Sequence, residues 1–195
     1  EPDASGAAYF FAAAALTGGQ VRVETLGYGS ALGDVRFVDV LEQMGCTVVR
    51  GQDFIELRGP RQLAGVDVDM NAINDQAQTL AAIAPFASGT VTIRNVAHIR
   101  HQETDRIAAV ARELRRLGAR VTELPDGLII EPSELRPALV QTYHDHRMAM
   151  SFALVGLRVP GIQIANPACV AKTFPDYFER FAAFTGATVE PIATS

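Results

Sequence analysis

Leu117-Gly118-Ala119-Arg120-Val121 marks the end of one helical pattern and the start of a strand-like one. A glycine directly after a helical pattern is typical of a helix C-terminus. The chain contains two further junctions of the same kind, Met44-Gly45-Cys46-Thr47-Val48 and Thr185-Gly186-Ala187-Thr188-Val189. We therefore interpret the chain as a repeat with a period of roughly 70 residues, longer than the units of solenoid proteins.

Each repeat carries an apolar helix, a strand, an amphipathic helix and a pair of strands. In the second repeat these are expected at 79–87, 90–94, 103–117, 120–123 and 128–131. In the first repeat the ranges are 7–16, 21–24, a helix from Asp34, 46–50 and 54–57. In the third they are a helix opened by Asp145, a strand at 161–165 and a helix at 174–184. The apolar helices should lie inside, and the amphipathic ones outside or beneath a sheet.

The pattern predicts one α/β domain of three helix-strand-helix-hairpin units related by a pseudo-threefold. The expected units are 1–65, 66–136 and 137–190, followed by a tail at 191–195. Asp3, Asp75 and Asp145 precede the apolar helices and are predicted N-caps. A pseudo-threefold could bring these helix N-termini to one face, where their partial positive charge would gather.

The composition excludes several classes of partner. With 48% hydrophobic and 20% charged residues, the chain is typical of a globular protein. A net charge of −5, with no basic run beyond Arg115-Arg116, argues against nucleic acid and anionic membrane surfaces. No apolar run is long enough to span a membrane. Cys46 and Cys169 lack metal-type spacing, so we expect reduced thiols in a cytoplasmic protein and no zinc site.

The sequence opens at Glu1-Pro2-Asp3, without an initiator methionine and already at the start of a helical pattern. We expect a piece of a longer protein.

The stretch from Thr142 to Met150 places His144, Asp145, His146 and Arg147 at the N-terminal mouth of a buried helix. Such a mouth favours an anion, and an arginine binds a carboxylate or phosphate through two parallel hydrogen bonds. Alternatively, Asp145 only caps the helix and Arg147 points to water.

Lys172 is the only lysine among 17 cationic residues. Its compact ammonium suits a phosphate oxygen where a flat guanidinium would not fit, although a chance surface lysine is the alternative. In Arg100-His101-Gln102-Glu103-Thr104-Asp105-Arg106, two arginines flank two carboxyls near a helix start. A carboxyl there can hold or give a proton, or it can simply form ion pairs in a solvated first turn.

Several motifs together resemble the 5-enolpyruvylshikimate-3-phosphate synthase family. They are Asp3-Ala4-Ser5 with Tyr9-Phe10, Asp75 with Thr79, Glu103-Thr104-Asp105-Arg106, Tyr143 with Asp145-His146-Arg147-Met148-Ala149-Met150, and Lys172-Thr173-Phe174-Pro175-Asp176-Tyr177. The resemblance implies the C-terminal part of a two-domain enolpyruvyl transferase with an inside-out α/β barrel. The second domain and an N-terminal segment would lie outside this sequence.

The resemblance also implies a reaction, in which the enolpyruvyl group of phosphoenolpyruvate passes to the 5-hydroxyl of shikimate 3-phosphate. Phosphate is released, no metal or organic cofactor takes part, and the product serves aromatic amino-acid biosynthesis. Asp75 would orient the shikimate hydroxyls and accept a proton, and Glu103 would exchange one with the methylene carbon. Arg106 and Arg147 would bind phosphoenolpyruvate, and Lys172 its phosphate.

Two positions depart from the family pattern on the side that binds shikimate. Gln102 replaces the usual lysine, and His98 replaces a common asparagine. Either Arg100 or His101 could supply the missing charge. Both Gln102 and His98 are nevertheless predicted substrate-binding residues.

Three competing interpretations stay open. The chain could belong to the sister enzyme that uses UDP-N-acetylglucosamine, or His98, His101, His144 and His146 could form a metal site with Asp145 or Glu103. The chain could also be a non-catalytic, anion-binding domain. We expect the isolated piece to be inactive, because half of its cleft would belong to the missing N-terminal domain.

Overall fold

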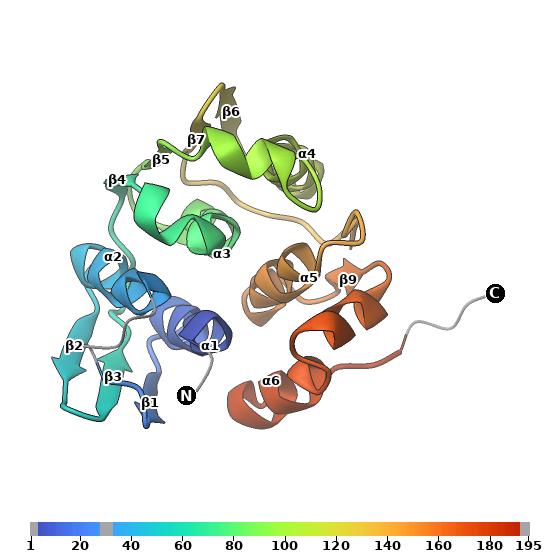
Figure 1. The fold of residues 1–195 in the computed structure, drawn as a ribbon. Helices are drawn as coiled ribbons and strands as arrows, with labels where there is room; N and C mark the ends of the chain where they lie inside the picture. Colours follow the sequence, from blue (N-terminus) through green and yellow to red (C-terminus); the bar gives the residue numbers. More distant parts are fainter. Residues whose placement is uncertain (1–3, 28–32, 192–195) are drawn as a thin grey trace.

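The computed structural model describes residues 4–27 and 33–191. Helices α1 (Ala4–Thr17), α3 (Ala77–Ile83) and α5 (His146–Ala153) lie at the centre of the molecule (Figure 1). α3 contacts both α1 and α5, and α1 packs against the 3-10 turn η5 (Leu154–Leu157) that continues α5. The apolar helices of the three repeats therefore lie inside, as the sequence predicts.

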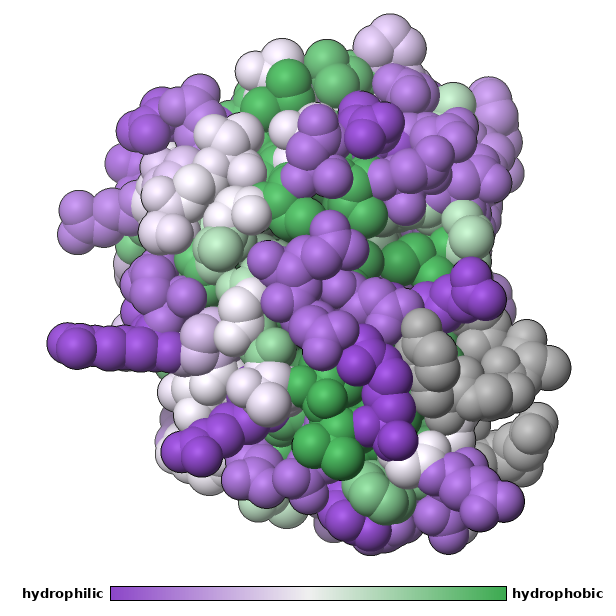
Figure 2. All heavy atoms as spheres, turned by 90° about the vertical axis from the view of Figure 1, so that its left-hand side faces the viewer, coloured by the Kyte–Doolittle hydropathy of each residue, from purple (hydrophilic) through white to green (hydrophobic). Residues whose placement is uncertain are grey.

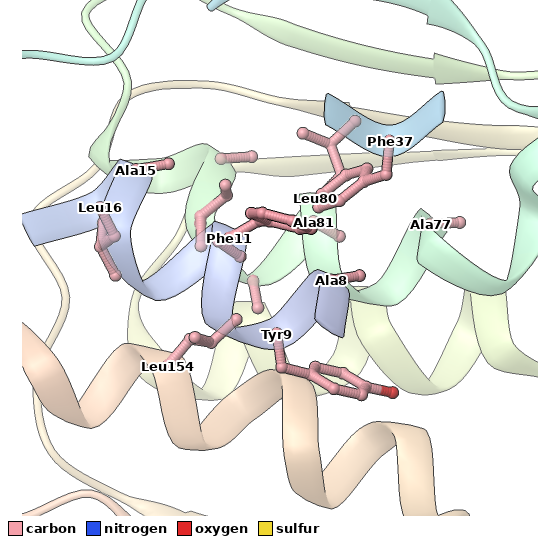
Figure 3. Packing of buried hydrophobic residues seen from close by; sticks show 14 of the residues in the cluster. Ala8, Tyr9, Phe11, Ala15, Leu16, Phe37, Ala77, Leu80, Ala81 and Leu154 are labelled. Atoms are coloured by element: carbon pink, nitrogen blue, oxygen red, sulfur yellow. The ribbon is translucent and has the colours of Figure 1, made fainter. Parts of the chain in front are cut away.

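Small residues allow the central helices to pack closely. Ala12 on α1 and Ala81 on α3 are both 0% exposed. In the core, Phe11 of α1 lies beside Leu80 and Ala81 of α3, with Phe37 behind them (Figure 3). Burial of each large apolar side chain stabilises the fold by about 1.5–3 kcal/mol.

The amphipathic helices form the outer layer: α2 (Phe37–Gln43), α4 (Arg106–Leu117) and α6 (Tyr177–Thr185) (Figure 1). Their three following glycines adopt left-handed backbone, with φ of 103° at Gly45, 102° at Gly118 and 71° at Gly186. Side chains other than glycine rarely adopt this conformation, which explains why glycine recurs at these junctions.

The strands form three sheets outside the central helices. In the first, β1 (Gln20–Glu24), β3 (Phe54–Arg58) and β2 (Thr47–Arg50) are antiparallel in that order. The second has the order β4 (Val66–Asp69), β5 (Val91–Arg94), β7 (Gly127–Ile130), β6 (Val121–Leu124), with β4 parallel to β5. The third contains the parallel pair β8 (Leu139–Val140) and β9 (Gln163–Ile164).

Several sequence predictions need correction. Asp75 is not an N-cap, because it lies inside the 3-10 segment η2 (Asn71–Gln76) and Gln76 precedes α3. Helix α4 begins at Arg106, not at Glu103, because the Asp105 side chain accepts a hydrogen bond from the Ala108 amide and caps it. Strands β4 and β8 were not predicted.

The third unit differs from the other two. Its expected strand at 161–165 shortens to Gln163–Ile164, and residues 187–191 form no strand after α6. A strand there would need a hydrogen-bonded neighbour, and Val189 is instead 47% exposed. The predicted N-cap Asp3 and most of the tail at 191–195 lie outside the described residues.

The face of the molecule on the side of α2 and the first sheet is largely hydrophilic, with hydrophobic side chains interrupted by polar ones (Figure 2). Among the described residues, no helix has both the length and the hydropathy needed to cross a bilayer.

Candidate functional site

The N-terminus of α5 is built around Asp145. Its Oδ1 accepts a hydrogen bond from the Arg147 amide at 2.8 Å, which confirms the predicted cap. Capping is not its whole role, since the side chain is 0% exposed and also faces Arg106. Nor does Arg147 point to water, because its Nη2 lies 2.7 Å from Asp75 Oδ2.

Arg106, the first residue of α4, holds Asp145 from the neighbouring unit. Its Nε lies 2.7 Å from Asp145 Oδ2 and its Nη2 lies 3.4 Å from Oδ1. Burial alone would raise the pKa of Asp145, but the hydrogen bond and charge of Arg106 outweigh this effect and lower the pKa. A buried carboxylate with such a partner stays charged at neutral pH.

Asp75 lies between the two arginines. Arg106 Nη1 is 3.3 Å from Oδ1 of Asp75, and Arg147, from the third unit, pairs with Oδ2 of Asp75. Asp75 lies inside η2, and Gln76 is the residue that precedes α3, so the carboxyl of Asp75 does not cap that helix. Its side chain is 35% exposed and can therefore reach a ligand.

Glu103 lies just before α4 and meets three proton-carrying groups. Lys172, at the end of the 3-10 segment η6 (Pro167–Lys172), forms an ion pair with its Oε1. Its Oε2 lies 3.0 Å from His146 Nδ1 and 3.6 Å from Arg106 Nη2. Burial lowers the pKa of His146, against the attraction of Glu103, so this imidazole is mostly neutral at pH 7.

These side chains surround an open hollow of about 610 Å³, lined by Asp75, Gln102, Glu103, Arg106, His146, Arg147, Lys172 and Thr173. With His146 neutral, its walls carry three cations against two carboxylates. Such a volume accommodates a small-molecule ligand, and the excess of cations favours an anion.

The structure thus brings together residues from four separate stretches of the sequence: Asp75, Glu103 with Arg106, Arg147, and Lys172. Gln102 also lines the hollow, and its Oε1 accepts a hydrogen bond from Arg106. His98 is exposed and is not among the lining residues. His146 and Thr173 also line it. The sequence places His146 at the mouth of the helix beside Arg147 without a substrate-binding role, and Thr173, next to Lys172, was not predicted.

Arg100 and His101 do not lie in the hollow. Arg100 is directed to Asp105, Glu123 and two backbone carbonyls of the β6–β7 hairpin. His101 is exposed outside the lining residues. Neither residue replaces the charge that a lysine would bring at position 102.

The alternative metal site is reduced to Glu103, Asp145 and His146, whose ligand atoms lie within 4.8 Å of one another. Among the described residues, His98, His101 and His144 do not join this group. Both carboxylates already pair with Arg106, and Glu103 also pairs with Lys172. A metal cation would have to displace these cations, so the arrangement suits an anion better.

A family model described as EPSP synthase (3-phosphoshikimate 1-carboxyvinyltransferase) matches residues 1–181. This chain belongs to the EPSP synthase family. A 3-phosphoshikimate 1-carboxyvinyltransferase of Nostoc punctiforme is 64% identical over 181 residues, which cover 93% of this chain and 42% of that relative. One from Nitrosomonas europaea is 54% identical over 190 residues, covering 95% and 44% respectively.

Two solved structures share the fold. EPSP synthase from Acinetobacter baumannii superposes with a TM-score of 0.79 at 31% identity, over 92% of this chain and 44% of that one. The enolpyruvyl transferase NikO from Streptomyces tendae gives 0.72 at 24% identity, over 94% and 43% respectively, which supports the fold alone. The predicted α/β class is confirmed, and the chain spans less than half the length of these relatives.

Proposed function

We propose that the complete polypeptide carrying this chain transfers the enolpyruvyl group of phosphoenolpyruvate to the 5-hydroxyl of shikimate 3-phosphate. The supporting observation is that Asp75, Glu103, Arg106, Arg147 and Lys172 surround one hollow in a chain of the EPSP synthase family. This chain would be most of one of two domains, with units 1–65, 66–136 and 137–190. The other domain and an N-terminal segment would complete the cleft.

The three cations would bind phosphoenolpyruvate, and they differ in how exposed their side chains are. Arg106 is 4% exposed and held by Asp145, so it contributes a fixed positive charge. Arg147 is 13% exposed and Lys172 is 64% exposed. We propose that Arg106 and Arg147 together bind the carboxylate and phosphate of the substrate. Lys172 would bind the phosphate as well.

The two carboxyls would divide the proton transfers. In the addition step, the carboxyl of Glu103 gives a proton to the methylene carbon, the 5-hydroxyl oxygen bonds to the neighbouring carbon, and Asp75 accepts the hydroxyl proton. In the elimination step, the methyl group returns a proton to Glu103 and the double bond re-forms. Phosphate leaves with the C–O bond electrons and takes the proton that Asp75 had accepted, which restores both carboxyls. The nearby cations stabilise the departing phosphate, so the proposal needs no metal or organic cofactor.

Localisation in the cytoplasm is part of the proposal, since this pathway supplies aromatic amino acids there. Cys46 and Cys169 are both unpaired thiols, in agreement with a reducing compartment.

The test measures phosphate release by the complete polypeptide with both substrates, and with UDP-N-acetylglucosamine in place of shikimate 3-phosphate. We expect release only with shikimate 3-phosphate, and a loss of kcat of about 100-fold or more in Glu103→Gln. The 195-residue chain alone should give none, and adding the separately produced remainder should restore it. Release with the UDP-sugar alone, or turnover by the isolated chain, would refute the proposal.

A further inference from the structure

The backbone directly before Asp145 is in an unfavourable conformation. Tyr143 and His144 have φ of 54° and 59°, so two consecutive residues with large side chains occupy the left-handed region. Such a conformation persists only where the surroundings determine it. Asp145, His146 and Arg147 follow at once, so their position depends on what holds this turn.

Glu113 holds the turn from α4. Its carboxyl is 0% exposed, and Oε1 accepts a hydrogen bond from the Tyr143 hydroxyl at 2.6 Å. Oε2 accepts from the Gln141 amide at 3.0 Å and from Arg116 Nε at 3.0 Å. One buried carboxyl therefore fixes both a side chain and the main chain of the segment that leads into α5.

The turn is also closed by its own backbone, because the Asp145 amide donates to the Thr142 carbonyl at 2.9 Å. Its other side-chain contacts are longer or more exposed. The Arg112 guanidinium lies 5.7 Å from the centre of the Tyr143 ring, and His144 Nδ1 lies 3.1 Å from Asn166 Nδ2 at the surface. Burial and the hydrogen bond to Glu113 raise the pKa of Tyr143, so its hydroxyl keeps the proton that it donates.

Helix α4 thus holds this segment at two places. Arg106, at its start, pairs with Asp145, and Glu113, about two turns further along, binds Tyr143 and Gln141. A rigid helix that fixes both points also fixes the backbone between them.

We propose that Glu113 is a positioning residue for the anion site, acting through Tyr143 and Gln141 to hold the left-handed turn that places His146 and Arg147. Glu113 is not among the residues that line the hollow, so it is not itself catalytic. Its effect on turnover rests on the proposed function, whereas its effect on the turn does not.

The test compares Tyr143→Phe and Glu113→Gln in the complete polypeptide with Tyr177→Phe. The control removes a buried tyrosine hydroxyl that donates to the Met150 carbonyl at 2.9 Å, away from the turn. We expect KM for phosphoenolpyruvate to rise about 10-fold in the first two variants, as for loss of a hydrogen bond to a charged group. It should change less than about 2-fold in Tyr177→Phe, and the double variant should be no worse than Glu113→Gln.

A second readout needs no turnover. NMR titration of the His146 imidazole should show its pKa moving up toward that of an exposed histidine in Tyr143→Phe and Glu113→Gln, because the loosened turn admits water. Tyr177→Phe should leave it unchanged. An unmutated protein that forms no product would refute the proposed function only. Unchanged His146 titration in both variants would overturn the positioning role.

Discussion

Arg100 and Arg106 flank one loop, six positions apart, and each binds several acceptors in very different surroundings. Arg100 fastens the loop to the β6–β7 hairpin. Its Nη1 lies 2.9 Å from Asp105 Oδ2, and its Nη2 lies 2.9 Å from Glu123 Oε1. Arg106 lines the hollow, where it pairs with Asp145, Asp75 and Glu103.

The difference lies in what each acidic partner would do alone. Asp105 and Glu123 are 42% and 30% exposed, so water would solvate them if Arg100 were removed. Asp145 is 0% exposed, so water could not solvate its carboxylate if Arg106 were removed. Removing the same residue type at the two ends of one loop should therefore cost little at one end and much at the other.

The largest effect is expected from Arg106→Met, which leaves Asp145 buried without its cation. Unfolding free energy should fall by about 3–5 kcal/mol, measured by urea denaturation. The matched control is the double variant Arg106→Met with Asp145→Asn, in which asparagine still caps α5 without a buried charge. It should recover most of the loss, and equal destabilisation in both variants would show that the charge of Asp145 is not the cause.

Arg100→Gln should have a smaller effect, because its acidic partners remain solvated. We expect a loss of about 1–2 kcal/mol in unfolding free energy, chiefly from the hydrogen bonds to the hairpin. Repeating the change in a Glu123→Gln background measures how much of this depends on that pair. A loss as large as that of Arg106→Met would remove the distinction between the two arginines.

The pH dependence of stability should also differ between the hollow, which contains His146, and the loop beside Arg100, which contains His101. The pKa of His146 is lowered by burial, so the unfolded chain takes up a proton that the folded chain does not. The stability that the neutral His146 contributes to the fold is fully present above an ordinary histidine pKa of about 6.5. It is lost as the pH falls from there through the pKa of His146 in the folded state.

The corresponding measurement is Tm between about pH 8 and pH 5, a range that spans the titration of a histidine in the unfolded chain. The fall in Tm toward acid should be reduced in His146→Gln. His101→Gln, an exposed change beside Arg100, should follow the unmutated profile. Identical profiles for all three proteins would exclude His146 as a source of acid sensitivity.

Local signals made much of the fold predictable. The apolar runs in α1, α3 and α5 and the glycines after α2, α4 and α6 are determined within a few residues. Strand β4, Val66-Asp67-Val68-Asp69, carries the alternation of a strand but was missed because it is only four residues long. Its pairing with β5, from Val66 against Val91 to Asp69 against Arg94, makes it visible in the structure. Strand β8 has two residues and a partner in Gln163–Ile164, so its existence depends almost wholly on the tertiary fold.

The site residues also divide into those that local sequence predicts and those whose roles depend on distant partners. Asp145 was predicted as a cap from its position, and that prediction is confirmed. Asp75 had the same local signal but proved wrong as a cap, because its carboxyl turns to Arg147, which lies 72 positions away. Sequence also could not separate Arg106 from Arg100, since the direction of each side chain is set by distant partners.

Gln102→Lys should give the smallest change in stability and sharpens the comparison inside the hollow. Lysine cannot accept the hydrogen bond that Arg106 now gives Gln102, but Arg106 keeps Asp145 and Asp75. Because position 102 is exposed, the added repulsion is screened and should cost about 0.5–1 kcal/mol. In the complete polypeptide with the proposed activity, a fourth cation in the hollow should at the same time lower KM for shikimate 3-phosphate about 3-fold, and this effect should shrink at high salt.

Gln102→Met is the matched control, because it also removes the acceptor for Arg106 but adds no charge. If the two variants lose similar stability and only lysine lowers KM, the charge at position 102 acts on the substrate and the hydrogen bond acts on the fold. Equal KM values would mean that the hollow already supplies enough positive charge through Arg106, Arg147 and Lys172. The replacement of the family's lysine by Gln102 would then carry no cost in binding.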